Sequence, residues 1–217
     1  MTIQDVTLVV PTRGPAEATE KFLRTLDHPL ERVTLVYDEG RLESSVPDMA
    51  SPCRLVSAPV KRKGFCEIQE LGFVDCPTSH FIGLAIDLAV APGTIGKAVD
   101  CYNAQIGNRD GIVKLRHHSN SHDDQVACFI LIAKQFYLDH CWPTPYLYFW
   151  IDQEWTDIAQ SLGCYAVADN IPIVHPSSSH HGSEWEQDRQ LYEKRKQERK
   201  TQSHEKRTDW NSALNSA

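Results

Sequence analysis

This chain of 217 residues contains no apolar run long enough to cross a membrane. A membrane-spanning helix needs about 20 consecutive apolar residues, and charged or polar residues interrupt every apolar stretch well before that length. The N-terminus, Met-Thr-Ile-Gln-Asp-Val, also lacks the basic region and the apolar core of a secretory signal peptide. These absences predict a cytoplasmic protein without a membrane span.

An excess of positive charge is missing too. The chain has 22 Lys and Arg against 29 Asp and Glu, which is a formal net charge of −7. A general nucleic-acid binder carries a basic surface, so this balance disfavours that class of protein. The chain is long enough to bury a sizeable core, and 41% of its residues are hydrophobic. We therefore expect a globular domain.

The seven cysteines form no Cys-x-x-Cys pair, and their number is odd. This spacing disfavours a zinc ribbon. Free cysteines are commonly buried core residues, so we expect reduced thiols in the core rather than a catalytic cysteine.

The first forty residues alternate between apolar runs and an amphipathic segment. Residues 6–10 and 32–37 are typical of buried strands, and residues 16–26 carry apolar side chains at helical spacing. Strand, helix and strand in this order predict an α/β fold with a mostly parallel central sheet flanked by helices. Such sheets bind ligands at the carboxyl ends of their strands. The residues expected at that edge are Thr12, Arg13 and Asp38.

The alternation continues along most of the chain. Further strands are expected at 54–57, 80–86, 113–116, 127–133 and 170–175, and further helices at 64–72, 94–106, 135–140 and 152–163. From 184 to 207 the chain is almost wholly polar, with Trp185, Leu191 and Tyr192 as its main apolar residues. We expect one domain over residues 1–182 and a polar tail over residues 183–217, either a solvated helix or disordered.

Asp87 directly follows the apolar run at 80–86. A carboxylate at the carboxyl end of a strand faces the ligand crevice and can hold a divalent cation against a diphosphate. It can equally cap the helix that follows, and the local sequence favours neither interpretation.

Two more carboxylates, Asp152 and Glu154, follow the aromatic-rich residues 146–150 at an expected helix start. One of them can act as a general base that removes a proton from an acceptor hydroxyl, or both can favour the helix start through its dipole. His175 ends the last expected strand, and imidazole binds divalent metals. A lone histidine in such a place is more often structural.

Two polar clusters have weaker signals. His117, His118 and His122 lie beside two aspartates, Asp123 and Asp124, and are typical of a polar loop, with metal binding as the less favoured alternative. The basic turn at 61–63, before Gly64, can meet a phosphate or remain solvated.

Taken in order, these segments resemble the GT-A fold of glycosyltransferases that use nucleotide sugars, nearest to family 2, over residues 5–182. Val-Val-Pro-Thr-Arg at 9–13 resembles that family's first strand and nucleotide loop. Asp38 resembles the aspartate that binds uracil or ribose, and Gly64 resembles the glycine turn that closes over the nucleotide. By this resemblance, the residues at the donor are Pro11, Thr12, Arg13, Asp38, Gly64 and Ile86.

The remaining motifs of the resemblance concern metal and catalysis. Ile86-Asp87 resembles the end of the Asp-x-Asp metal motif, and His175 matches the later metal-binding histidine. This implies Mn²⁺ or Mg²⁺ held by Asp87 and His175. Trp-Ile-Asp-Gln-Glu-Trp resembles the acidic motif, with Asp152 as the catalytic base and Glu154 orienting the acceptor or substituting as base.

The chain departs from the family pattern at three places. Ala85 stands where the first aspartate of Asp-x-Asp belongs, which bears on donor affinity and metal dependence. The helix after Gly64 has Gln69 and Glu70 in place of the usual asparagine. No arginine follows the acidic motif at the common helical position.

The resemblance implies a metal-dependent, inverting transfer of a hexose from a nucleoside diphosphate sugar to an acceptor hydroxyl. The donor implied is a UDP-sugar. The acceptor can be a glycan or another molecule, including a modified nucleic acid. Two alternatives stay open: a noncatalytic nucleotide-sugar binder of the same fold, suggested by Ala85, and a metal-dependent hydrolase or nucleotidyltransferase built on the histidines.

Overall fold

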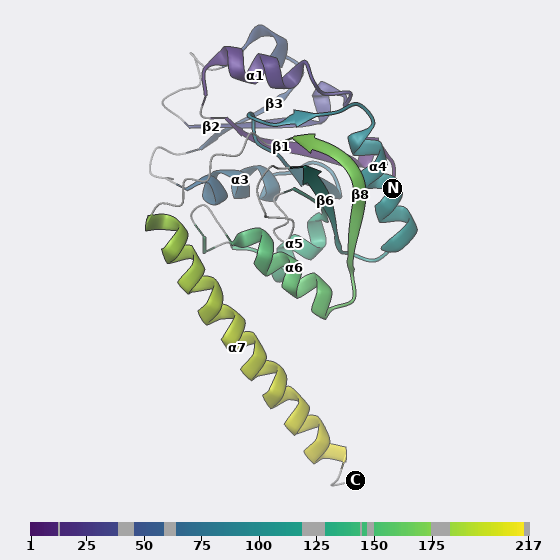
Figure 1. The fold of residues 1–217 in the computed structure, drawn as a ribbon, viewed down its shortest axis with the longest axis vertical. Coiled ribbons are helices and arrows are strands. Elements are labelled where there is room, and N and C mark those ends of the chain that lie inside the picture. The colour runs from purple at the N-terminus through teal and green to yellow at the C-terminus, as the bar shows by residue number, and fades with distance from the viewer. Residues whose placement is uncertain are drawn as a thin grey trace.

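A computed structural model describes residues 1–12, 14–38, 46–58, 64–118, 129–143, 145–146, 150–174 and 183–214. These residues form an eight-stranded sheet with helices on both sides and one long helix leaving the domain (Figure 1). The strands are β1 (Val6–Thr12), β2 (Val33–Asp38), β3 (Arg54–Ala58), β4 (His80–Gly83), β5 (Ala89–Val90), β6 (Ile112–His118), β7 (Ile130–Ala133) and β8 (Tyr165–Val174). The α-helices are α1 (Ala16–Leu23), α3 (Phe65–Val74), α4 (Thr94–Gln105), α5 (Lys134–His140), α6 (Ile151–Ser161) and α7 (Ser183–Leu214).

The strand order is β3-β2-β1-β4-β7-β6-β8-β5. β1 is parallel to β2 and β4, β2 is parallel to β3, and β6 is parallel to β8. β7 runs antiparallel to both β4 and β6, so β6 and β8 point in the same direction as β1. The carboxyl ends of six strands therefore meet at one edge of the sheet. The predicted α/β fold with a mostly parallel sheet is confirmed.

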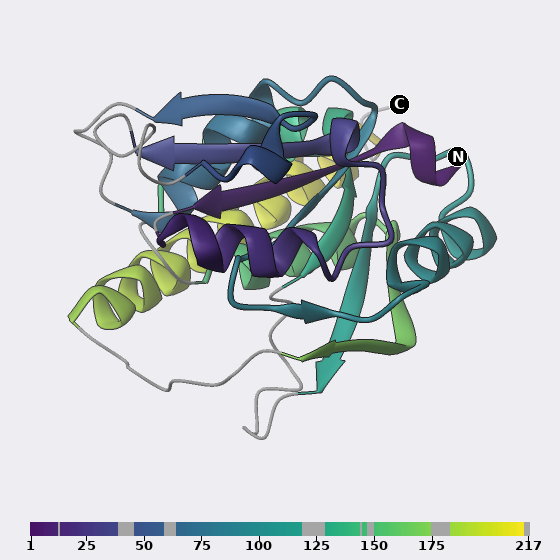
Figure 2. The same ribbon diagram turned by 90° about the horizontal axis from the view of Figure 1, so that it is seen from above.

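The sheet is covered on both faces (Figures 1 and 2). α3, α5 and α6 pack together on one side, where the rings of Phe73, Tyr137 and Trp155 contact one another at centroid distances of 5.4 to 5.9 Å. α1 and α4 lie on the opposite side (Figure 2). Every residue of β1 is buried, because helices cover both faces of the sheet there. A strand buried in this way is mostly apolar rather than alternating.

The ends of two strands differ from the sequence-based expectation. The apolar run at 80–86 predicts a longer strand, but β4 stops at Gly83. Its described pairing with β7 covers His80 to Ile82, and its last residue, Gly83, pairs with Val9 of β1. Leu84 and Leu88 are nevertheless buried in the core, which explains the apolar run. β8 begins at Tyr165, five residues before the predicted start, because β6 pairs with it from Ile112 onward.

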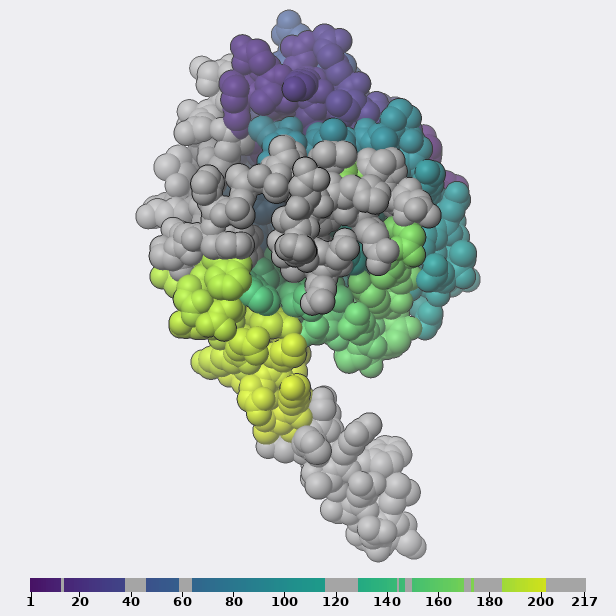
Figure 3. Space-filling model, in the orientation of Figure 1, coloured from purple at the N-terminus to yellow at the C-terminus, as the bar shows by residue number. Residues whose placement is uncertain are grey.

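α7 is a single helix from Ser183 to Leu214. Its first part lies against the body of the domain (Figure 3). There Asp188 and Tyr192 are each only 2% exposed, and Leu191 packs against the core. Among the described residues, no helix is both long and apolar enough to cross a membrane.

α3 approaches the sheet closely at Gly72. A Cβ atom at this position would overlap Val9 Cγ1 and lie 2.9 Å from Val36 Cγ2. Both valines are fully buried in central strands, so they have no room to move aside. Gly72 therefore sets the distance between α3 and the sheet.

Gly72→Ala is expected to lower the free energy of unfolding by about 1–2 kcal/mol, because overpacking a core typically costs ~1–3 kcal/mol and outweighs the ~1 kcal/mol gain in helix propensity. Urea unfolding measures this change. The matched control is Gly96→Ala in α4, where nothing lies within 4 Å of the added Cβ. That control should stabilise the protein, and a stabilised Gly72→Ala variant would contradict the close packing of α3.

Candidate functional site

The carboxyl end of β1 carries the first group of predicted donor-binding residues. Pro11 and Thr12 are buried, and the Thr12 hydroxyl donates a hydrogen bond of 3.0 Å to the carbonyl oxygen of Val36. The Thr12 side chain thus joins β1 to β2. Arg13 lies outside the described residues. Asp38 is the last residue of β2 and pairs with Ala58.

The loop after β1 contacts the turn that carries Asp87. A Cβ atom on Gly14 would lie 2.7 Å from Ile86 Cδ1, so only glycine fits there without moving Ile86. Asp87 is exposed, and Ala85 and Ile86 are half-buried against the core. The structure therefore brings two of the predicted donor segments together at the ligand edge.

A strand that the sequence analysis missed positions Asp87 relative to the end of β8. β5 consists only of Ala89 and Val90 and runs antiparallel to β8, with Ala89 opposite Val174. Asp87 precedes Ala89 by two residues, and His175 directly follows Val174 in the sequence. His175 itself lies outside the described residues. The pairing places the turn of Asp87 beside the end of β8, where the predicted metal ligands belong.

Gly64 begins α3 and is buried. Its N–H donates a hydrogen bond of 3.3 Å to the Glu67 carboxylate, a capping interaction within the first turn. Its φ of −89° is one that any residue adopts, so the glycine is not required for its backbone conformation. The basic turn at 61–63 lies outside the described residues.

The acidic segment occupies the first turn of α6. Trp150 precedes the helix with a φ of 66°, a left-handed conformation that is uncommon for a bulky residue. Asp152 is half-buried, and its Oδ1 accepts a hydrogen bond of 3.0 Å from the Gln153 N–H. A carboxylate in the first turn is favoured by the helix dipole, which stabilises its charged form.

Asp152 lies close to the beginning of α3. Burial raises the pKa of the Cys66 thiol well above its usual value, and the negative charges of Asp152 and Asp188 raise this pKa further. Cys66 is two residues after Gly64. The charge of Asp152, on α6, therefore acts on a thiol in the first turn of α3.

Glu154 has a different environment from Asp152. Its carboxylate is 3% exposed and accepts hydrogen bonds from Arg195 Nε at 2.9 and 3.1 Å, and it also pairs with Arg199. Both arginines belong to α7. Neighbouring positive charges favour the charged form of a carboxylate and lower its basicity. This environment suits a structural ion pair better than a general base.

The histidine-rich segment also begins at the ligand edge. The backbones of His117 and His118 pair with Ile173 and Val174 at the ends of β6 and β8. The other members of that cluster, His122 and the two aspartates after it, lie outside the described residues. Within the described ranges, no three His, Cys, Asp or Glu residues are grouped so that they could hold a metal ion.

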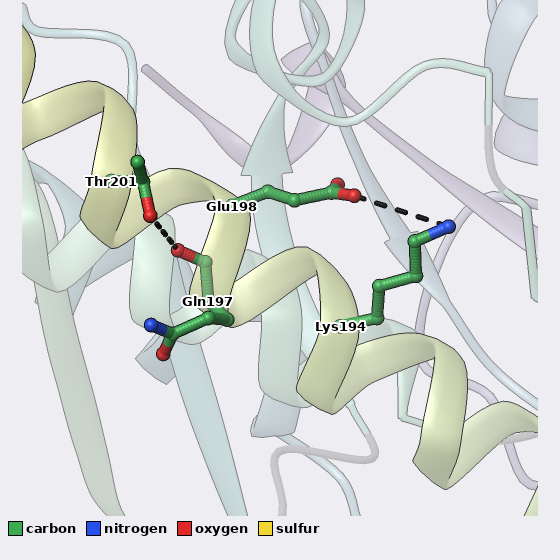
Figure 4. A pocket seen from close by; sticks show the side chains of 4 residues that line it. All are labelled: Lys194, Gln197, Glu198 and Thr201. Atoms are coloured by element: carbon green, nitrogen blue, oxygen red, sulfur yellow. Dashed lines mark hydrogen bonds and ion pairs between the residues drawn. The ribbon is translucent and has the colours of Figure 1, made fainter.

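A shallow hollow of about 440 Å³ lies along α7 (Figure 4). Its lining residues are Lys194, Gln197, Glu198 and Thr201. All four come from one helix, and Lys194 Nζ lies 4.0 Å from Glu198 Oε1. This hollow is the surface of an exposed helix and contains none of the predicted site residues.

No family model matches the sequence, and no curated protein matches it either. The chain is, however, similar in structure to several solved proteins. The mannosyltransferase PcManGT from Pyrobaculum calidifontis, in complex with GDP-Man and Mn²⁺, has a TM-score of 0.60 at 14% identity, over 81% of this chain and 58% of that chain. S. aureus TarS 1-349, in complex with UDP-GlcNAc, has a TM-score of 0.57 at 12% identity, over 86% of this chain and 61% of that chain.

A third similar structure is glucosyl-3-phosphoglycerate synthase from Mycobacterium tuberculosis in complex with Mn²⁺, UDP and glucosyl-3-phosphoglycerate. Its TM-score is 0.55 at 14% identity, over 82% of this chain and 72% of that chain. The chain has a GT-A fold. The GT-A fold accounts for the strand order. The chain spans about 60% of the length of the mannosyltransferase and of TarS 1-349.

Proposed function

We propose that this protein transfers a sugar from a nucleoside diphosphate sugar to an acceptor hydroxyl. The observation that carries the proposal is the pairing of Ala89 with Val174. Asp87 lies in the turn two residues before Ala89, and His175 directly follows Val174 in the sequence. The pairing therefore brings the turn of Asp87 to the end of β8, at the carboxyl edge of the sheet, where ligands bind in folds of this class.

The donor occupies the carboxyl ends of β1, β2 and β4. Arg13 and Asp38 hold the nucleoside, with Pro11 and Thr12 forming the floor through their backbone and Gly64 bordering the site from α3. Ile86 keeps the β1 loop against the turn of Asp87, as its contact with Gly14 indicates. UDP-sugars are the first donors to test.

Asp87 and His175 would hold the metal ion. The Asp87 carboxylate suits Mn²⁺ or Mg²⁺, and the His175 imidazole favours Mn²⁺ over Mg²⁺. A bound ion of this kind would neutralise the negative charge of the leaving diphosphate. Ala85 offers no ligand atom, so substrate phosphate and water would have to complete the coordination.

Asp152 acts as the general base that takes the proton from the acceptor hydroxyl. It lies half-buried in the first turn of α6, where its Oδ1 accepts a hydrogen bond from the Gln153 N–H. Attack by the deprotonated hydroxyl from the side opposite the leaving diphosphate would invert the anomeric configuration. Glu154, bound by two arginines, orients α6 and does not take the proton.

A thermal-shift screen of nucleotide sugars with and without Mn²⁺ tests the proposal. A ligand at about 100 times its Kd stabilises the native state by ~2.7 kcal/mol, which corresponds to about 5–10 °C for a domain of this size. We expect such a shift for one sugar nucleotide, larger with Mn²⁺ than without. Mn²⁺ alone and the free sugar are the controls, and no shift with any sugar nucleotide would refute the proposal.

The histidine cluster supports a second candidate, a metal-dependent hydrolase or nucleotidyltransferase. Its supporting observation is the position of His118 beside Val174 at the same edge. This candidate requires that replacement of His117 or His122 abolish activity, whereas the glycosyltransferase function requires little effect. Donor binding without transfer or donor hydrolysis would instead identify a noncatalytic binder.

A further inference from the structure

We infer that α7 is a positioning element for the active site: Arg195, Arg199 and Tyr192 hold the first turn of α6 so that Asp152 meets the acceptor. This inference rests on the proposed function of Asp152. The long polar helix, which the composition predicts to be a solvated or disordered tail, would then be part of the catalytic domain.

The first contact is between Glu154 and the two arginines. The carboxylate is almost fully removed from solvent, while Arg195 and Arg199 are 37% and 30% exposed. Pairs with a buried member are screened little by solvent, and removing one partner of a buried pair leaves a charge without compensation. Glu154 is two residues from Asp152, so whatever fixes Glu154 also fixes the turn that carries Asp152.

A second contact joins α7 to the next turn of α6. Tyr192 Oη donates a hydrogen bond of 2.7 Å to Asp157 Oδ2, and Lys196 Nζ donates one of 2.8 Å to Tyr192 Oη. Lys196 Nζ also lies 3.5 Å from Asp157 Oδ2. Glu154 and Asp157 are three residues apart, so both face α7 from one side of α6.

The third contact holds the residue before the helix. The Trp150 ring stacks on Tyr192 with centroids 5.1 Å apart and an angle of 24°, and it contacts Trp185 at 5.5 Å. Trp150 has a left-handed backbone conformation. Such a conformation persists in a bulky residue only where the surroundings impose it, and α7 supplies two of the rings that do so.

The contacts leave Asp152 on another face of α6. Successive helical residues are turned by about 100°, so Asp152 is directed roughly 200° away from Glu154. Trp150, Glu154 and Asp157 therefore contact α7 from a side of the α6 helix that does not carry Asp152. In this geometry α7 supports α6 from the side opposite Asp152.

Arg195→Ala in the full-length protein tests this role. We expect kcat to fall by about 10-fold or more, because small displacements of a catalytic group are costly, while the KM and Kd for the sugar nucleotide stay within about twofold. Arg195→Lys should restore part of kcat, because it keeps the charge but not the paired geometry. Lys194→Ala is the matched control, because Lys194 pairs only within α7 and is 73% exposed.

Hydrogen exchange of residues 151–161 supplies a readout that does not depend on turnover. In Arg195→Ala, amide protection in α6 should fall, while protection in β1 and β2 should not change. Unchanged α6 protection would overturn the inference, and so would a kcat within twofold of wild type.

Two further outcomes are distinguishable. If Arg195→Ala fails to fold, Tyr192→Phe decides, since it keeps the ring against Trp150 and removes only the hydroxyl bonded to Asp157. It should lower kcat about threefold or more with donor Kd unchanged, and an unchanged kcat would overturn the inference. If wild-type protein transfers and hydrolyses no donor, the proposed function fails, and the exchange measurement still tests whether α7 holds α6.

Discussion

Asp152→Asn is expected to lower kcat by about 10²–10⁴-fold, the usual contribution of a general base. The amide is close in size to the carboxylate but cannot accept a proton. The proposed donor site is at the ends of β1, β2 and β4, whereas Asp152 lies on α6, so the Kd for the sugar nucleotide should not change. Steady-state transfer kinetics and donor titration measure the two effects separately.

Two comparisons make this result specific. Asp100→Asn makes the same chemical change on an exposed residue of α4 and should leave kcat unchanged. Glu154→Gln should mainly destabilise the protein, because it removes the charge that compensates Arg195 and Arg199. Near-normal turnover of Asp152→Asn, together with a stable but inactive Glu154→Gln, would instead identify Glu154 as the general base and leave Asp152 without that role.

Asp87→Ala is expected to abolish the effect of Mn²⁺ on donor binding and to lower kcat/KM by about 10²–10³-fold. Metal stabilisation of the leaving diphosphate is worth several kcal/mol, and each 1.36 kcal/mol is a factor of ten in rate. Asp87 is exposed in its turn, so the fold should tolerate the change. The difference in melting temperature with and without Mn²⁺, at saturating donor, measures the metal effect directly.

Asp100→Ala is the control for this variant as well, since it removes an exposed carboxylate on α4. His175→Ala should reproduce the loss of the Mn²⁺ effect, because the proposal gives both residues to the same ion. A Mn²⁺-dependent shift that survives in Asp87→Ala would remove Asp87 from the metal site and direct attention to the histidines at the end of β6.

Several elements were predictable because their signals are local. The β-branched run at 6–10 is buried on both faces in β1, and the amphipathic segment after Trp150 forms α6. The ends of the strands were harder to predict from the sequence. An apolar run does not reveal where its neighbours stop, so β4 ends at Gly83 although buried residues continue to Leu88.

In the candidate site, too, some features were predictable from local signals and others depended on distant segments. The sequence placed Thr12 and Asp38 after strands, and parallel pairing of β1 with β2 brings those ends together. The neighbourhood of Asp87 and the end of β8 depended on β5, a strand of only two residues. A strand of two residues is too short to show a periodic pattern, so the local sequence could not predict that pairing.

The sequence alone determined the order of the longer strands and helices, the polar character of the last segment and the carboxylates available for chemistry, because each depends on residue type and local spacing. Only the tertiary structure decided that Val174 meets Ala89 and that Arg195 meets Glu154. Both contacts join segments far apart in the chain, and an arginine in a polar helix has the same local signature whether it faces water or a buried carboxylate. The packing of α7 against α6 determines that Arg195 faces the buried carboxylate of Glu154.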